Sequence, residues 1–326
     1  MRYRELLTSA ALIAVLGGTA WAQATRTFVS GVGNDADPCS RTAPCRTFAG
    51  AFNKTAVNGE ISVLDPGGYG GLTITKSISI NGEWGGEAGS LVAGAGVNGI
   101  TVNAGSTDRV NLRGLYIQGV GTATNGIRYL AGGSLHVQNT VVQGFRASSA
   151  GGGNAILVAP TGGNLVLDLD NVLLVDNGVP ANVGAGLAIR PTGAAVVRVT
   201  GMRVQSLGNQ VGVDINGDNG TGAVDLTLAD STLSRNVGDG LSCFSPNGAD
   251  ALVRVTVDSS MAAGNGGIGL HSVGQRCTVR VKDSVSTANA AAGLQANNSG
   301  ILQSYGDNAT EGNGNANAGV TPAPPS

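Results

Sequence analysis

Apolar and polar residues alternate in several segments of the chain. Four segments, 165–177, 224–236, 253–265 and 277–289, align with one another without a gap, and the first, third and fifth residues of each are apolar. A period of two is typical of β-strands that bury one face. A polar pivot residue then precedes a second short stretch, and each of the four segments ends at an Asn. The pattern therefore predicts short strands separated by tight turns.

A longer repeat organises these strands. A Gly or Ala followed by an aliphatic residue recurs every 24 to 31 residues, and several copies carry an Asn four residues earlier, in the form N-x-x-x-G-[LIV]. The pairs are Gly99–Ile100, Gly126–Ile127, Ala155–Ile156, Gly186–Leu187, Gly212–Val213, Gly240–Leu241, Gly269–Leu270 and Gly293–Leu294, with the Asn at 182, 236, 265 and 289. A repeat this short cannot bury its own apolar face, so stacked repeats must share one core. We therefore expect an all-β fold, a single parallel β-helix with three short strands per coil. A sandwich of hairpins would instead need two-residue turns between antiparallel runs.

The two ends of the chain differ from the repeats. Residues 47–56 place Phe48, Ala51, Phe52 and Ala56 at helical spacing, which predicts a short amphipathic helix over the open first coil. We expect an N-terminal strand, a cysteine loop and this capping helix over 25–59, and the β-helix over 60–310. Residues 311–326 lack an aliphatic pattern and predict a disordered tail.

The tandem N-x-x-x-G-[LIV] coils over roughly 60–310 resemble the right-handed parallel β-helix, or pectate-lyase-like, superfamily. The resemblance implies right-handed coils. In carbohydrate-active relatives it also implies a groove on the face of the strand that follows the Gly, walled by the loops before that strand. It specifies a fold and no activity, since none of the lyase or polygalacturonase motifs of the superfamily is intact here.

Composition and the N-terminus limit the function further. The chain has 326 residues, of which 54 are glycine, more than twice the usual share, and its net charge is −2. Its 41% hydrophobic content argues against disorder, and the lack of a basic block argues against a nucleic-acid partner.

The N-terminus predicts a signal peptide over residues 1–24. It has two basic residues, Arg2 and Arg4, then an apolar run over 6–16, and then small-residue cleavage sites that end at Ala22 and Ala24. We expect a secreted or periplasmic monomer without a membrane span after cleavage.

Four cysteines are available for disulfides in an exported protein. Cys39 and Cys45 stand six residues apart in a Pro-containing loop, and we expect them to be bonded. Cys243 and Cys277 fall at inward strand positions, where a disulfide or two reduced thiols would both fit. The chain has no C-x-x-C motif, which argues against a zinc site.

Candidate ligand-binding residues lie on the outward positions of the strand that follows the Gly. The first outward column comprises Thr101, Arg128, Leu157, Ala188, Asp214, Ser242, His271 and Gln295. The next outward column adds Arg190, Asn216 and Phe244, and the longest preceding loops, 144–154 and 177–185, stand beside Arg128 and Arg190. Asp214 with Arg190 and Asn216 would bind a hydroxyl-rich or acidic ligand, and Phe244 would stack on a sugar ring.

A complete catalytic set is missing from these columns. A glycosidase generally needs two carboxylates roughly 5 to 9.5 Å apart, and Asp214 is the one acid in the two columns. His271 lies two coils away, about 10 Å at the usual strand spacing. We therefore expect contact with polysaccharide or another extended polymer without catalysis. The alternatives are a polysaccharide lyase or glycoside hydrolase that uses Asp214, Arg190, His271 or Arg128, and a structural or adhesive solenoid.

One stretch has calcium-like spacing, although no cofactor is expected. Asp214, Asn216, Asp218 and Asp225 occupy positions 1, 3, 5 and 12 of a calcium-loop pattern, but position 6 is Asn219 where that pattern needs Gly. A polar turn is the favoured interpretation of this stretch.

Opposite charges align on successive coils of the next strand, which predicts a stabilising ladder on the surface. One series is Arg198, Asp225 and Arg254, and another is Asp258 and Lys282.

Overall fold

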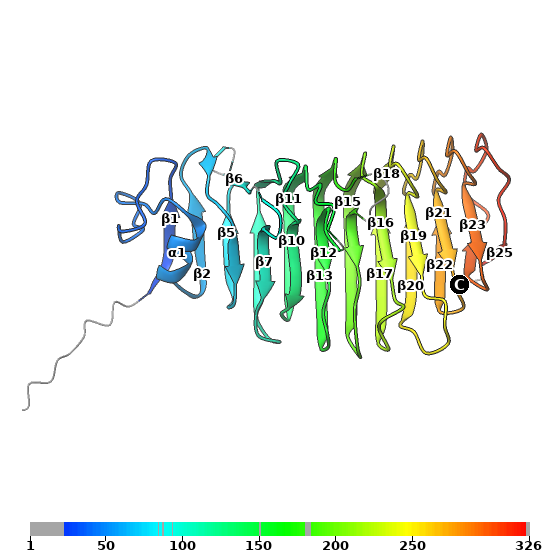
Figure 1. Ribbon diagram of the computed structural model, residues 1–326, viewed down its shortest axis with the longest axis horizontal. Helices are drawn as coiled ribbons and strands as arrows, with labels where there is room; N and C mark the ends of the chain where they lie inside the picture. Colours follow the sequence, from blue (N-terminus) through cyan, green and yellow to red (C-terminus); the bar gives the residue numbers. More distant parts are fainter. Residues whose placement is uncertain are drawn as a thin grey trace, which may run out of the picture.

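The computed structural model describes residues 23–323 except 84, 87, 93, 150 and 180–183. The chain winds into one elongated solenoid, with α1 (Phe48–Lys54) and β1 (Ala24–Val29) at one end and β25 (Val320–Pro322) at the other (Figure 1). The predicted signal peptide lies outside the described residues apart from its last two positions.

Every pair of strands in the described chain is parallel, in two sheets. The nine strands of sheet B are, in order, β23 (Leu294–Asn297), β21 (Leu270–Val273), β19 (Leu241–Phe244), β16 (Val211–Asn216), β14 (Ala185–Ile189), β12 (Asn154–Val158), β10 (Asn125–Ala131), β7 (Asn98–Asn103) and β4 (Leu72–Ile74). The main path of sheet A is β1, β2 (Thr55–Val63), β5 (Ile78–Asn81), β8 (Arg109–Arg113), β11 (Ser134–Gln143), β13 (Asn164–Val175), β15 (Val196–Leu207), β17 (Ala223–Ala229), β20 (Leu252–Asp258), β22 (Cys277–Lys282), β24 (Ile301–Ser304) and β25. Beside this path lie β3 (Gly67–Gly68), β6 (Ala88–Leu91), β9 (Leu115–Gln118) and β18 (Thr232–Ser234).

The order of strands confirms the predicted parallel β-helix. From β4 to β24, strands of the main path of sheet A alternate along the chain with those of sheet B, and each pairs with the equivalent strand about one repeat away. The register agrees with the sequence alignment: Asp214 stands opposite Ala188 on one side and Ser242 on the other. The number of strands per coil and the handedness stay predictions.

The inward positions of both sheets form one continuous apolar core. It runs from Val29 and Phe48 at the N-terminal end to Leu302 near the C-terminus, and its side chains are almost wholly buried. Because coils stack on coils, each aliphatic side chain lies against its counterpart one repeat away, and only the two ends of the core need separate cover.

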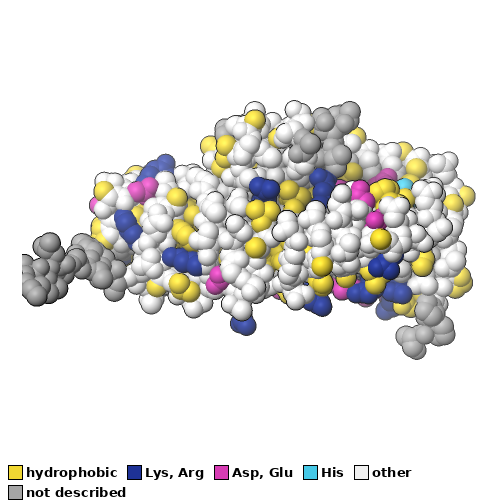
Figure 2. Space-filling model, turned by 60° about the horizontal axis from the view of Figure 1, so that its bottom comes forward, with side chains coloured by type: hydrophobic (Ala, Val, Ile, Leu, Met, Phe, Trp, Pro, Cys, Tyr) yellow, Lys and Arg dark blue, Asp and Glu magenta, His cyan; other side chains and the backbone are white. Residues whose placement is uncertain are grey.

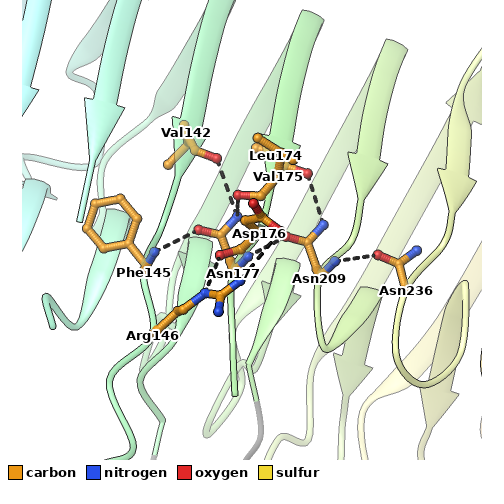
Figure 3. A network of polar contacts seen from close by, with 9 residues as sticks. All are labelled: Val142, Phe145, Arg146, Leu174, Val175, Asp176, Asn177, Asn209 and Asn236. Carbon is orange, nitrogen blue, oxygen red and sulfur yellow. Dashed lines mark hydrogen bonds and ion pairs between the residues drawn. The ribbon is translucent and has the colours of Figure 1, made fainter. Parts of the chain in front are cut away.

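A recurrent Asn forms a buried ladder inside the solenoid (Figure 3). The ladder includes the predicted Asn236, Asn265 and Asn289, but Asn182 lies outside the described residues and the ladder passes through Asn177. The backbone N–H of each Asn donates to the Oδ1 of the Asn one coil later, from Asn177 to Asn209 at 3.0 Å and from Asn209 to Asn236 at 3.0 Å. The series continues through Asn265 and Asn289 to Asn313. The side-chain amides also donate to backbone carbonyls of the preceding coil, as Asn209 does to Leu174. The ladder therefore satisfies backbone groups at a bend, where the chain leaves the regular sheet.

The predicted helix covers the N-terminal end of the core. Thr47 caps α1 by accepting the N–H of Gly50, and Phe48 and Phe52 are buried over the first coil. Both cysteine pairs, Cys39–Cys45 and Cys243–Cys277, are disulfides. For Cys243 and Cys277 the sequence left open a disulfide or two reduced thiols, and the structure has the disulfide.

The predicted disordered tail is wrong for residues 311–323. Asn313 and Asn317 accept backbone N–H groups from Asn289 and Leu294, and β25 pairs with β24. Val320 also packs on the edge of the core. Side-chain amides and one packed valine keep this segment in place, so it is ordered without an aliphatic pattern. Residues 324–326 lie outside the described chain.

Acid should loosen the N-terminal end through Asp65. Burial raises the pKa of this carboxyl, but hydrogen bonds from Ser30, the Gly31 N–H and the Tyr69 hydroxyl outweigh burial and hold the pKa below its usual 3.8. A lowered pKa stabilises the fold above pH 3.8, and that stability is lost as the pH falls through the still lower folded value.

We therefore expect Asp65→Asn to reduce stability at pH 7 and to flatten the fall in stability below pH 4, measured by urea unfolding followed by circular dichroism. The exposed Asp218→Asn variant serves as control. Equal acid sensitivity of wild type and Asp65→Asn would contradict the assignment.

Candidate functional site

The predicted site residues lie on the outward face of sheet B. Arg128 is in β10, Asp214 and Asn216 are in β16, Phe244 is in β19 and His271 is in β21, all partly exposed. Figure 2 shows basic, acidic and histidine side chains in one row on the surface. The register places Asp214, Ser242 and His271 opposite one another on consecutive strands, as the sequence predicts.

Arg190 and Asp214 form an ion pair. Arg190 directly follows β14, and its Nη2 lies 2.8 Å from Asp214 Oδ2, with Nε at 3.3 Å from the same oxygen. The side chains are only 21% and 16% exposed. The pair bridges two coils, so each group is held in place by the other.

Arg128 does not join this pair. Between β10 and β16 lie two strands whose outward residues Leu157 and Ala188 are buried, in a small apolar cluster with Ala185 that is separate from the main core. Ala159 and Val211 pack against the same cluster, so an apolar, buried stretch interrupts the polar column in the middle of the face. Residues 150 and 180–183 of the predicted long loops lie outside the described residues. Three strand spacings, about 14 Å, separate the positions of Arg128 and Asp214.

A second polar group is centred on His271. Its Nδ1 lies 2.9 Å from Asp239 Oδ2, and its Nε2 lies 3.0 Å from the Nδ2 of Asn297. An amide nitrogen can only donate, so in this arrangement Nε2 accepts and the proton is on Nδ1, which donates to Asp239. Asp239 is fixed in turn by the backbone N–H of Ile268 at 2.7 Å.

Asp239 is absent from the site residues predicted from the sequence, although the repeat contains a signal for it. It precedes Gly240 in the turn N-x-x-x-G, and the same turn position holds the apolar residues Ile268 and Ala292 in the next two coils. In the structure this acid contacts His271, on the strand of sheet B one coil away. Gly267 leaves room for it, because a Cβ there would lie 2.2 Å from Asp239 Oδ1.

The calcium-like residues do not converge. Asp214 is paired with Arg190, while Asn216 Oδ1 accepts the N–H of Asp218 in a local polar turn. Asp225 lies in sheet A, where its Oδ1 contacts Arg254 Nε at 2.5 Å. Within the described residues no group of three or more His, Cys, Asp or Glu side chains could hold a metal ion. The expected ladder on sheet A has the predicted register, Arg198 to Asp225 to Arg254.

The N-terminal part of the same face is hollowed. A shallow recess of about 630 Å³ lies between α1 and the first strands of sheet B, where Thr73 and Thr101 continue the outward column. Asn53 and Phe52 of α1 line its other side. The face therefore carries hydroxyl and amide groups at one end and the two charged groups nearer the other.

Comparison with known proteins supports the fold and assigns no family. No family model matches the chain, and no curated protein matches it. Among solved structures it is similar to pectate lyase Pel9A, with 17% identity, a TM-score of 0.55, and coverage of 91% of this chain and 77% of that one. A rhamnogalacturonan lyase shares 11% identity over 85% of this chain and 75% of its own, with a TM-score of 0.37, too low to bear on the fold. The protein thus has the pectate-lyase-like parallel β-helix fold.

A membrane-spanning helix is not found in the part of the chain that the structure describes.

Proposed function

We propose that this is an exported β-helix protein that binds polysaccharide along the outward face of sheet B without cleaving it. The observation that carries the proposal is the alignment of two fixed polar groups, Arg190–Asp214 and Asp239–His271–Asn297, on one face. A polymer that lies along the solenoid meets strands at a regular spacing of about 4.8 Å. The fold it shares with pectate lyase Pel9A supports a polysaccharide as the polymer.

The positions between the two groups fit this use. Ser242 and Phe244 of β19 lie on the strand between β16 and β21, and both are partly exposed. A hydroxyl and an aromatic ring between hydrogen-bonding groups are suited to sugar hydroxyls and to a sugar face. The side chains are held by one another before a ligand arrives, which lowers the entropy lost on binding.

Export supports the same function. The predicted signal peptide and the two disulfides both suit an oxidising compartment outside the cytoplasm, where polysaccharides are encountered.

Binding is tested by titrating the exported chain with polygalacturonate and with an uncharged glucan in calorimetry. We expect Ser242→Trp, which obstructs the face between the two polar groups, to raise the Kd by about tenfold or more. Thr227→Trp, on the outward face of sheet A, is the matched control and should change the Kd by less than about twofold. Absence of polysaccharide binding by the wild type, or equal binding by both variants, would refute the proposal.

The Asp239–His271 pair favours one alternative, a lyase or hydrolase. A histidine whose Nδ1–H is held by a carboxylate presents Nε2 as a base, once the amide of Asn297 moves aside. Assays for unsaturated products and new reducing ends, with and without calcium, decide between the two functions. Turnover that both His271→Gln and Asp214→Ala abolish would make the protein an enzyme.

A further inference from the structure

The first strand of the solenoid has an unpaired edge. The carbonyl of Val29 accepts the N–H of Leu64, which follows β2, at 3.0 Å, so Val29 faces β2. The preceding residue, Phe28, faces the other way: its N–H donates to Cys39 O and its carbonyl accepts the N–H of Cys45, both at 2.9 Å. The cysteine loop therefore covers the outer edge of β1 at Phe28.

This cover ends before Arg26. Backbone groups of alternate residues in a strand point to the same edge, so the N–H and carbonyl of Arg26 point outward as those of Phe28 do. Within the described chain neither group has a hydrogen bond to the cysteine loop, to another segment beyond the β1–β2 ladder or to a side chain. Such an open edge of a sheet can accept another strand.

A cavity of about 720 Å³ lies against the same edge. Phe28, Pro38 and Cys39 give it apolar walls, and Ala24 and Ala36 line it further. This volume falls in the range of ligand-binding cavities and would hold several side chains. Open backbone groups beside an apolar cavity are the two features of a site that binds an extended peptide.

The charge of the lining favours an acidic partner. Arg26, Arg41 and Lys54 line the cavity together with one acid, Asp37. Arg26 is paired with Glu60 at 3.1 Å, but Lys54 donates its hydrogen bonds to neutral backbone carbonyls, among them that of Asp35 at 2.5 Å. The described residues give Arg41 no ion-pair partner. The cavity is thus locally positive in a chain of net charge −2.

We propose that this end of the solenoid binds an extended peptide of another protein, with alternating apolar and acidic residues, as an additional strand beside β1. Its backbone would pair with Arg26, its apolar side chains would enter the cavity, and its acids would face Arg41 and Lys54. A second copy of this chain fits less well. The strand at the opposite end, β25, spans only three residues and ends in Pro322, which lacks an N–H.

The test uses a fluorescein-labelled octapeptide of alternating valine and glutamate, titrated into the exported chain and followed by fluorescence anisotropy. Arg26→Pro removes the outward N–H, whereas Arg26→Ala removes the side chain and keeps that N–H. We expect Arg26→Pro to weaken binding at least about tenfold relative to Arg26→Ala. Ala36→Trp, which fills the cavity, should weaken peptide binding by a similar factor. Val32→Trp is the control: Val32 lies on the same loop, exposed and outside the cavity, so the Kd should change by less than about twofold.

Circular dichroism at 25 °C confirms that each variant is folded before titration. An octapeptide of alternating valine and lysine that binds as well as the acidic peptide would overturn the proposal, because charge would then play no part. So would undiminished binding by both Arg26→Pro and Ala36→Trp, or no binding by the wild type. Concentration-dependent dimers in ultracentrifugation that Ala36→Trp abolishes would assign the edge to a second copy instead.

Discussion

Replacing Asn265 by Leu should lower the free energy of unfolding by about 4 kcal/mol, the largest effect we expect from a single substitution. The side chain is 1% exposed and nearly isosteric with Leu, so the change is mainly a loss of hydrogen bonds. Asn265 Oδ1 accepts both the backbone N–H and the side-chain amide of Asn236, and Asn265 Nδ2 donates to Leu233 O. Each buried group left without a partner costs about 1–3 kcal/mol.

The measurement is the shift of the urea midpoint, followed by far-ultraviolet circular dichroism. Asn111→Ala is the control, since Asn111 lies on an exposed position of β8 and donates one hydrogen bond to Ser79. We expect it to change stability by less than about 0.5 kcal/mol. A loss below about 1 kcal/mol for Asn265→Leu would show that the ladder does not stabilise the coils.

The two disulfides should differ in their contributions to stability. Cys243–Cys277 closes a loop with a sequence separation of 34, and Cys39–Cys45 closes one of 6. A crosslink restricts the unfolded chain more when it closes a longer loop, which gives about 4 kcal/mol for the first pair and about 2 kcal/mol for the second. We therefore expect Cys243→Ala with Cys277→Ala to shift the urea midpoint more than Cys39→Ala with Cys45→Ala.

Both pairs are fully buried, so the alanine variants lose similar packing and each double variant is a control for the other. Equal shifts would rule out loop closure as the main cause. Calorimetry of the two double variants distinguishes entropy from lost packing enthalpy, because loop closure acts on the entropy of the unfolded chain.

The periodic part of the fold could be predicted because each residue of a repeat has an equivalent one coil away. The alternation in 224–236 and 253–265 sets which side chains face inward, and the paired register of Asp225 with Arg254 confirms it. The capping helix was predictable for a similar reason, since Phe48 and Phe52 have helical spacing. The order of residues 311–323 could not be predicted, because the segment has no apolar pattern. Asn313 and Asn317 keep it in place by accepting hydrogen bonds from backbone N–H groups.

The candidate site was predicted in part for the same physical reason. Outward columns follow from strand register, so Asp214 and His271 were found on one face. Asp239 lies in a turn, where register gives no direction for the side chain, and it was missed. The burial of Leu157 and Ala188 could not be foreseen either, since alternation gives the direction of a side chain and not what packs against it.

The buried Asn ladder has a direction. Each Asn from 177 to 289 donates its backbone N–H to the side chain of the Asn in the following coil, so the donor of each coil is satisfied only by the coil after it. A chain cut after any one of these coils would therefore keep, at its new end, a buried N–H donor without an acceptor. Asn313, in the segment after the last strand of sheet B, accepts the final N–H of the series. That segment therefore terminates the series, because it gives the last coil the acceptor that each earlier coil obtains from its successor.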